Sequence, residues 1–492
     1  MLEQTAPTES ELSSRRGLMT AGLALLGGAL TVEALAQSVP PPDPSTNWRT
    51  AELRLLRRIS YGVTPEDALS ARQLGFSRLL ETQFTVAEAA SVESTVRARW
   101  PRMSQTARQL AQYNDDWQTA HDCKLMTLHR RCYGKRQLFE KMVEFWHDHF
   151  SIHADKVGGW LLVPYDRDVI RRNAFGKFPD LLMATAKSAA MMVYLDNAQS
   201  YAGNPNQNYA REFMELHTMG AGSGYTQDDV EALSKMLTGW SYQWDDTKPN
   251  HGEFLFDAEA HEAGPKVFMG QTYNQGGIQE GEAAIRFIAN HPATANFIAR
   301  KLTRYLLRYD APATVVQRVA QVYRSTGGDI KAMIRAVLTQ QLVMIAPAKY
   351  KRPSHLVLSM LRSMKANVAD WNSVYWGYLY QVGHAPFDWA PPNGYPDAAE
   401  YWTGLILPRW NLSLGLGGGW WDGTGINIAT LIQGLTTTAQ VVSKINTMFF
   451  AGEMPTQDQA ELRAYLANRG IDEWSIREAF GLTMASHSFQ WF

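Results

Sequence analysis

The sequence predicts a mostly α fold: one large multi-helix domain with a small β-hairpin and a long irregular loop rich in Pro and Trp. Three observations lead to this prediction. Apolar residues recur at spacings of three and four along most of the chain, strand patterns are few, and prolines gather in one late stretch. We therefore expect residues 50–492 to form a single domain, which is long enough to bury a large core.

The helical pattern is clear from residue 50 onward. Leu53, Leu56 and Ile59 are spaced as on one helix face, and Thr64 before Pro65 is a typical helix start. Thr226 and Asp229 form a similar capping pair. The predicted helices span residues 50–58, 135–150, 166–174, 179–192, 208–219, 226–239, 280–290, 293–307, 313–326 and 330–339.

Two other segments depart from this pattern. Phe254–Phe256 and Val267–Gly270 have strand character and are expected to pair as a small hairpin around a loop. Residues 383–411 hold Pro386, Pro391, Pro392, Pro396 and Pro408 together with Trp389, Trp402 and Trp410. So many prolines predict an irregular loop, and long structured loops are often functional.

The N-terminus has the features of a twin-arginine signal peptide. Arg15 and Arg16 precede an apolar run from Leu18 to Leu35, and Ala34-Leu35-Ala36 is typical of a cleavage site. Residues 1–36 are thus predicted to direct export to the periplasm or the medium, leaving no stable transmembrane span. The alternative is an uncleaved anchor. Residues 37–49, with Pro40-Pro41-Pro42, are expected to form an extended tether.

The composition narrows the range of ligands and cofactors that we expect for this protein. The net charge of −1 gives no reason to expect a nucleic-acid partner. The 16 tryptophans and 20 tyrosines suit either a glycan or peptide ligand or an ordinary large core. No phosphate-binding loop and no C-x-x-C-H motif occur, so neither a nucleotide nor c-type haem is expected. Cys123 and Cys132 allow one disulfide after export.

The first candidate site lies in the predicted 135–150 helix. Glu144 and His147 are three residues apart and share a face, a spacing that carboxylate-bridged metal sites use. His149 and His153 share a second face. The alternative is an aromatic-rich core helix whose histidines are simply hydrogen-bonded.

The second candidate site lies in the predicted 208–219 helix. Arg211, Glu212 and Glu215 fall on one face with Asn208, and His217 follows near the end of the helix. Such a stripe is too polar to be buried without partners. It lines a polar site, where Arg211 orients carboxylates, or it forms a surface ion-pair ladder of little energetic value.

Two loops supply further candidates for substrate binding. His261 and Lys266 stand close together in a Gly- and Pro-containing segment, which is otherwise read as a surface loop. His384 and Asn393 lie in the proline-rich stretch, where the alternative for His384 is a hydrogen bond that fixes the loop.

Together these motifs resemble the DUF1800 family, large bacterial proteins of unknown function. The resemblance runs from about Leu53 to the end, and Asn208–Trp240 is its most specific part. At Gln207 this chain lacks a carboxylate that the family usually has. The resemblance implies export and a DUF1501 partner, a protein similar to the alkaline phosphatase and sulfatase superfamily. Further matching segments are Phe145–Phe150, Tyr194–Asn197, Gly383–Pro396 and Ala485–Gln490.

Two functions follow as hypotheses. The first is an exported metal-dependent enzyme, hydrolytic or oxidative, with Fe, Mn or Zn. Its metal ligands would be Glu144, His147, His149 and His217, with Arg211, Glu212 and Glu215 as catalytic groups. The second is a non-catalytic periplasmic binding or assembly protein that works with the DUF1501-like partner.

Overall fold

The computed structural model describes residues 43–274 and 276–492, so the predicted signal peptide and most of the tether lie outside the described residues. The last part of the predicted tether is not extended. Pro44–Asn47 form the 3-10 helix η1, which Asp43 caps by accepting a hydrogen bond from the Ser45 amide at 2.8 Å. Trp48 is buried against the guanidinium of Arg57. An indole with a cationic neighbour anchors this segment to the domain.

The prediction of a mostly α fold is confirmed, and so are the helix starts predicted at Thr64 and Thr226, although the predicted 179–192 helix is divided into α11 and α12. The Thr64 hydroxyl accepts a hydrogen bond from the Asp67 amide at 3.1 Å, as a helix N-cap should. The first helices are α3 (Ala51–Ile59), α4 (Pro65–Thr85), α5 (Ala90–Arg99), α6 (Ala107–Leu110), α7 (Asp116–Tyr133), α8 (Gln137–His149), α9 (Ala154–Val157), α10 (Gly159–Pro164), α11 (Phe178–Ala186) and α12 (Ala189–Tyr194), with η2 (Pro101–Ser104) and η4 (Asn197–Gln199) as 3-10 turns.

The second half of the chain continues the helical pattern. Thr226 and Asp229 form the predicted capping box. The helices are α13 (Gln207–Glu212), α14 (Gln227–Met236), α15 (Gly277–Ala289), α16 (Pro292–Leu306), α17 (Ala313–Thr326), α18 (Ile330–Val337), α19 (Gln340–Ile345), α20 (Pro353–Ser363), α21 (Trp371–Val374), α22 (Ala399–Trp402), α23 (Ile406–Gly418), α24 (Ile428–Ile432), α25 (Thr438–Phe450), α26 (Thr456–Arg469) and α27 (Glu473–Ala485), followed by η7 (His487–Gln490).

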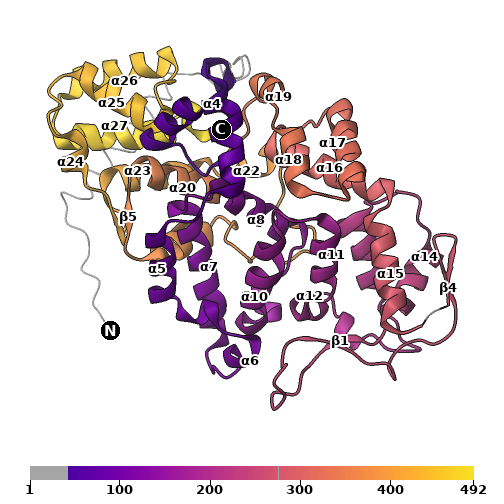
Figure 1. Ribbon diagram of the computed structural model, residues 1–492. Helices are drawn as coiled ribbons and strands as arrows, with labels where there is room; N and C mark the ends of the chain where they lie inside the picture. The colour runs from indigo at the N-terminus through magenta and orange to yellow at the C-terminus, as the bar shows by residue number, and fades with distance from the viewer. Residues whose placement is uncertain (1–42, 275) are drawn as a thin grey trace, which may run out of the picture.

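Helix α8 lies in the middle of the molecule. In Figure 1 the C-terminal helices α24 to α27 gather on one side of it, and α15 to α18 gather on the other. Every residue from Gln137 to Trp146 is buried. A helix that is buried all round carries its polar side chains into the interior, where each needs a partner.

In the described part of the chain, three segments are π-helices: η3 (Tyr165–Arg171), η5 (Phe213–Thr218) and η6 (Tyr375–Leu379). The predicted 208–219 helix is therefore α-helical only as far as Glu212. π-Helical turns are rare and are often found at functional sites. Each of the three contributes to a cluster described below.

The predicted hairpin pairing is wrong. β2 (Phe254–Phe256) pairs with β1 (Trp240–Tyr242), and β3 (Lys266–Phe268) pairs with β4 (Gln271–Tyr273), both antiparallel. The reason is local: Met269 and Gly270 both have positive φ and close a two-residue turn between β3 and β4. A third pair joins β5 (Asn367–Val368) to β6 (Thr424–Gly425).

The predicted irregular loop is shorter than expected. Only residues 383–398 are irregular, because α22 and α23 occupy most of the remainder up to 411. Pro408 is the third residue of α23, where a missing amide hydrogen breaks no helical bond. Farther along α23, Gly417 lies so close to Gly481 of α27 that a Cβ would come within 2.6 Å of the Gly481 amide nitrogen.

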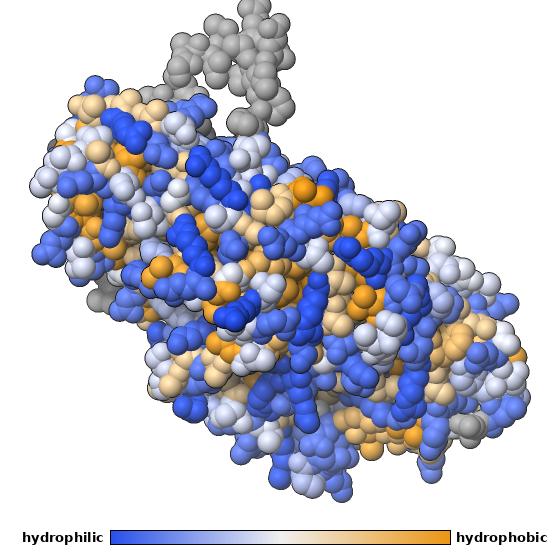
Figure 2. Space-filling view, turned by 45° about the horizontal axis from the view of Figure 1, so that its top comes forward, coloured by the Kyte–Doolittle hydropathy of each residue, from blue (hydrophilic) through white to orange (hydrophobic). Residues whose placement is uncertain are grey.

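Within residues 43–274 and 276–492, no helix has both the length and the apolar character needed to cross a bilayer. Figure 2 shows one face of the molecule, on which hydrophilic side chains alternate with small hydrophobic patches.

Candidate functional site

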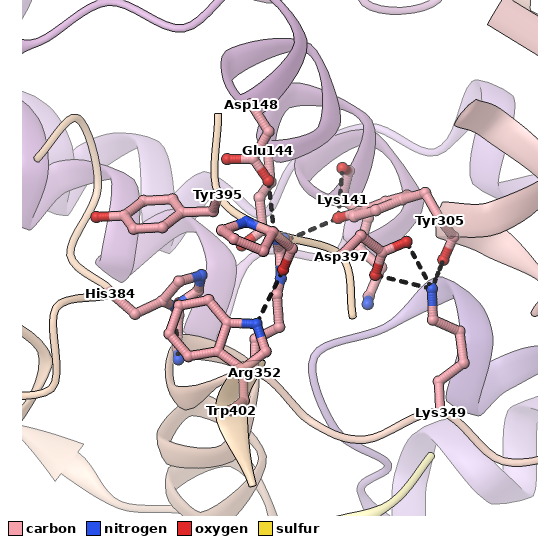
Figure 3. Close-up of polar contacts among 12 residues, drawn as sticks. Lys141, Glu144, Asp148, Tyr305, Lys349, Arg352, His384, Tyr395, Asp397 and Trp402 are labelled. Carbon is pink, nitrogen blue, oxygen red and sulfur yellow. Dashed lines mark hydrogen bonds and ion pairs between the residues drawn. The ribbon is translucent and has the colours of Figure 1, made fainter. Parts of the chain in front are cut away.

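A cavity of ≈ 30 Å³ lies between the C-terminal half of α8 and the irregular 383–398 segment. A space of this size is large enough for an ordered water molecule. Two of the predicted site residues on α8 line it together with His384, and Figure 3 shows several of these side chains converging. Its lining consists of Arg131, Glu144, His147, Asp148, Ser151, Ile152, His384, Ala385, Pro386, Phe387, Trp389 and Tyr395.

Glu144 is the most heavily compensated side chain of this cavity. Its Oε2 accepts hydrogen bonds from the hydroxyls of Tyr305 at 2.7 Å and Tyr61 at 3.1 Å. Ion pairs join it to Arg352 at 3.0 Å and Arg131 at 3.3 Å. Burial acts to raise the pKa of Glu144, but the charges of Arg352 and Arg131 outweigh it and hold the pKa well below the ordinary value. Glu144 is therefore a fixed negative charge.

Asp148 lies one helical turn after Glu144, and its pKa is shifted in the opposite direction. Arg352 bridges the two carboxylates, because its Nη1 also lies 2.6 Å from Asp148 Oδ2. Burial raises the pKa of Asp148 to about 6; Arg352 opposes this increase, and the negative charge of Glu144 adds to it. Neighbouring carboxyl groups whose pKa values are displaced in opposite directions are typical of acid–base sites.

Two lysines, Lys141 and Lys349, lie close to this group of residues, as Figure 3 shows. Lys349 pairs with Asp397 at 2.9 Å. Lys141 faces the rings of Tyr61, Tyr305 and Phe492 instead. Burial lowers the pKa of Lys141 to about 7. The interior behind Glu144 thus favours anionic groups.

His147 is oriented by a buried carboxylate. Its Nε2 lies 2.8 Å from Asp166 Oδ1 on the π-helix η3, and Arg171 holds the other Asp166 oxygen at 2.8 Å. Burial lowers the pKa of His147, and the hydrogen bond to Asp166 only partly opposes it. A carboxylate can only accept, so Nε2 carries the proton and Nδ1 keeps the lone pair. Among the described residues, Nδ1 has no hydrogen-bond partner.

The wall opposite α8 is built by close backbone contact. A Cβ on Gly394 would lie 1.8 Å from the Asp148 carbonyl oxygen, so no other residue fits there. Phe387 has a positive φ of 64°, which is costly for a non-glycine residue, and its ring contacts that of His147 at 4.5 Å. Strained backbone of this kind is concentrated at functional sites.

His384 and Asn393, both predicted to bind substrate, differ in their positions. His384 is buried at the cavity, where its Nδ1 accepts a hydrogen bond from the Ser354 amide at 3.1 Å. Burial and the charge of Arg352 hold its pKa well below the ordinary value. Asn393 is exposed and accepts a hydrogen bond from Trp389 at 3.0 Å. Only His384 reaches the cavity wall.

His149 and His217, predicted as metal ligands, meet at a separate place. His149 Nε2 donates to the His217 carbonyl at 3.0 Å, and Lys301 Nζ contacts its Nδ1 at 2.8 Å. His217 is fully buried, and within the described chain neither of its ring nitrogens is hydrogen-bonded. Burial lowers the pKa of His217 to about 3 and that of Lys301 to about 8. The two rings lie 6.3 Å apart in a basic environment.

The predicted catalytic groups of the second helix lie outside the cavity. Arg211, Glu212 and Glu215 are half-buried, and Arg211 donates to Gln227 at 2.7 Å. Burial raises the pKa of Glu212, and the neighbouring charge of Glu215 adds to this. The structure keeps them together as a polar face of α13 and η5 but does not bring them to Glu144 or His147.

His261 and Lys266 are brought together by a residue that sequence reasoning missed. Glu280 of α15 is fully buried and lies 3.0 Å from His261 Nε2 and 2.5 Å from Lys266 Nζ. His261 Nδ1 also contacts the Thr238 carbonyl at 2.8 Å. These contacts hold β3 and the preceding loop against α15, so their evident role is structural.

The four predicted metal ligands do not lie together, because Glu144 and His147 line the cavity whereas His149 and His217 meet elsewhere. Among the described residues, no group of three or more His, Cys, Asp or Glu side chains is placed to hold a metal ion. The Glu144 oxygens already face two arginines and two tyrosines, and His147 Nε2 faces Asp166. Guanidinium groups repel a divalent cation at the same carboxylate.

Several residues of the site had no sequence signal. Arg352 is 204 positions from Asp148, and Asp166 lies 19 positions after His147. Asp148 could have been found, because it follows Glu144 by four residues on the same face. The predicted possibility of a disulfide is not realised in the structure. Cys123 and Cys132 are both free thiols buried along α7.

Comparison with known proteins identifies the family of this chain and gives no information on a reaction. No curated protein and no solved structure matches this chain. The sequence profile described as "Protein of unknown function (DUF1800)" matches residues 54–491, nearly the whole chain. The chain therefore belongs to the DUF1800 family.

Proposed function

We propose that this protein is an exported hydrolase that uses acid–base chemistry at the cavity between α8 and the 383–398 segment. Asp148 is the general acid and His147 is the general base. The observation that carries the proposal is the opposite displacement of the pKa values of Glu144 and Asp148 around the shared Arg352. Burial and the fixed charge of Glu144 raise the pKa of Asp148, as a general acid requires, while the lowered pKa of His147 keeps that ring neutral, as a general base requires.

The chemistry follows from the hydrogen bonds. A water in the cavity gives a proton to His147 Nδ1 as its oxygen attacks the electrophilic centre of the substrate. Asp166 holds the ring and stabilises the imidazolium that forms. Asp148 gives its proton to the leaving oxygen, whose bond to the electrophile breaks. Arg131, on the cavity wall, stabilises the developing negative charge.

The proposal is tested with protein purified from the periplasm and a panel of para-nitrophenyl glycosides, carboxylic esters and phosphodiesters. For any substrate that is turned over, Asp148→Asn and His147→Ala should each lower kcat/KM by about 100-fold or more. Glu215→Gln, a carboxylate outside the cavity, is the matched control and should keep full activity. Turnover that is unaffected in both cavity variants, or no turnover of any substrate class, would contradict the proposal.

The competing hypothesis is a binding or assembly protein that works with a DUF1501-like partner. It predicts that Asp148→Asn and His147→Ala lose stability or partner affinity. It also predicts that the wild type turns over none of the substrates. Thermal unfolding of Asp148→Asn separates the two, because a catalytic role requires a folded but inactive variant.

A further inference from the structure

Exposed aromatic side chains gather beside the cavity, on the first turns of α7 and on the π-helix η6. Trp117 is 67% exposed, Trp376 is 45% exposed, and Tyr380, just after η6, is 56% exposed. His121 lies between the two tryptophans. We call Trp117, His121, Trp376 and Tyr380 the aromatic surface. Large aromatic groups left in contact with water in one place mark a binding surface more often than scattered ones do.

The rings form a continuous series. The His121 imidazole is stacked on Trp376 with centroids 5.3 Å apart, and Trp117 lies 6.4 Å beyond it. On the other side, Tyr380 meets Trp376 edge to face at 4.8 Å. The buried His121 imidazole thus lies between the two exposed tryptophans, and we call this set of rings the platform.

The platform is held in place by polar contacts around its edge. Asn372 Oδ1 contacts His121 Nε2 at 2.6 Å, and the Asn372 amide group in turn donates to Asp370 at 2.9 Å. Beneath it, the Tyr375 ring packs against both His121 and Trp376. Rings fixed in this way lose little conformational entropy when a ligand binds.

The aromatic surface is connected to the cavity through one residue. Asp388 lies between Phe387 and Trp389, which both line the cavity, and it accepts hydrogen bonds from Tyr375 and Lys124. On the cavity side, the Trp389 ring contacts the Tyr395 ring, with centroids 5.0 Å apart. Asp388 thus joins the elements that carry the aromatic surface to the segment that lines the cavity.

We propose that the aromatic surface binds a neutral oligosaccharide and presents it to the cavity. A pyranose ring offers a flat face of C–H groups, which packs on an aromatic ring, and a rim of hydroxyls, which needs hydrogen bonds. The platform supplies both, with the rings at its centre and Asp370, Asn372 and Asp388 near its edge. Cleavage of the sugar rests on the proposed hydrolase function, whereas binding does not.

The charges near the platform favour this ligand over others. Asp370 is exposed, and the ammonium group of Lys124 is already paired with Asp388, so neither side chain favours an anionic lipid or an acidic polymer. The exposed groups are aromatic and edged by amide and carboxylate oxygens, which suit hydroxyl donors better than an aliphatic protein partner.

The test is titration calorimetry of the full chain with cellohexaose, maltohexaose and chitohexaose. At least one sugar should bind, and Trp376→Ala and Trp117→Ala should each weaken that binding by about tenfold or more. Trp244→Ala is the matched control, because Trp244 is 74% exposed outside the aromatic surface. It should leave the affinity unchanged. Asp148→Asn should bind the sugar normally, so loss of catalysis and loss of binding are distinguished.

Three results would overturn the proposal. The first is no binding of any of the three sugars at millimolar concentration. The second is equal weakening by Trp244→Ala. The third is a change of oligomeric state in Trp376→Ala by analytical ultracentrifugation without any sugar binding, which would assign the surface to contact between copies of the chain. Vesicles of neutral phosphatidylcholine provide the lipid control and should not bind.

Discussion

Two polar helix faces in this molecule look alike in sequence and differ in the partners that surround them. The α8 face carries Glu144, His147 and Asp148, and the α13–η5 face carries Arg211, Glu212 and Glu215. The first borders the cavity, and its partner Arg352 is shared between two carboxylates. The second is half-buried and borders no cavity described above. The comparison teaches that spacing places groups on one face, whereas burial and partners decide what they can do.

The largest effect should come from removing the fixed charge on α8. Glu144→Ala leaves Arg131 and Arg352 buried with one carboxylate fewer, so the unfolding free energy should fall by about 3–5 kcal/mol. Urea denaturation measures this. A loss below about 1 kcal/mol would show that the network is not tightly coupled.

The next effect concerns pH and the raised pKa of Asp148. A folded-state pKa of about 6, above the unfolded value of about 4, means that the folded state holds the proton more tightly. Stability from this group is therefore present below pH 4 and is lost as pH rises through 6. Between pH 4 and pH 6, the unfolding free energy of the wild type should fall by about 2 kcal/mol more than that of Asp148→Asn. Parallel pH profiles for the two proteins would contradict the assignment.

The same substitution on the other face should do little. Glu215→Ala removes a half-buried carboxylate with no ion pair among the described residues, so stability should change by less than about 0.5 kcal/mol. Equal losses for Glu215→Ala and Glu144→Ala would remove the distinction between the two faces.

The smallest effect is expected from metal removal. Because the Glu144 oxygens face cations, dialysis against a chelator should leave the melting temperature of the periplasmic protein unchanged, and metal analysis should find no stoichiometric Fe, Mn or Zn. A stoichiometric metal whose removal lowers the melting temperature would restore the metal hypothesis for this protein.

Local features of the fold were largely predictable from the sequence. Thr64 and Thr226 start helices as expected, because a cap depends only on residues three positions away. The hairpin pairing was not predictable from strand character alone, since it depended on the positive φ of Met269. The predicted irregular loop extends too far because the prediction treats Pro408 as excluding a helix. Prolines are tolerated in the first turn of a helix, where Pro408 lies.

The site was predictable only in part. Glu144 and His147 were placed by helix periodicity, but their partners come from distant segments that no local pattern connects to them. The pairing of His261 with Lys266 also depended on a third residue, Glu280. Charges brought together by tertiary packing have no signature in a single sequence.

The most direct test of the central claim is the titration of Asp148 itself. Carboxyl carbon NMR of protein labelled at aspartate, with Asp148→Asn to assign the resonance, reports its protonation in the folded state. The acid–base proposal predicts a midpoint near pH 6, which Glu144→Gln should lower because the neighbouring negative charge is removed. A midpoint at or below pH 4 would contradict it, since Asp148 would then carry no proton to donate at the pH at which the protein works.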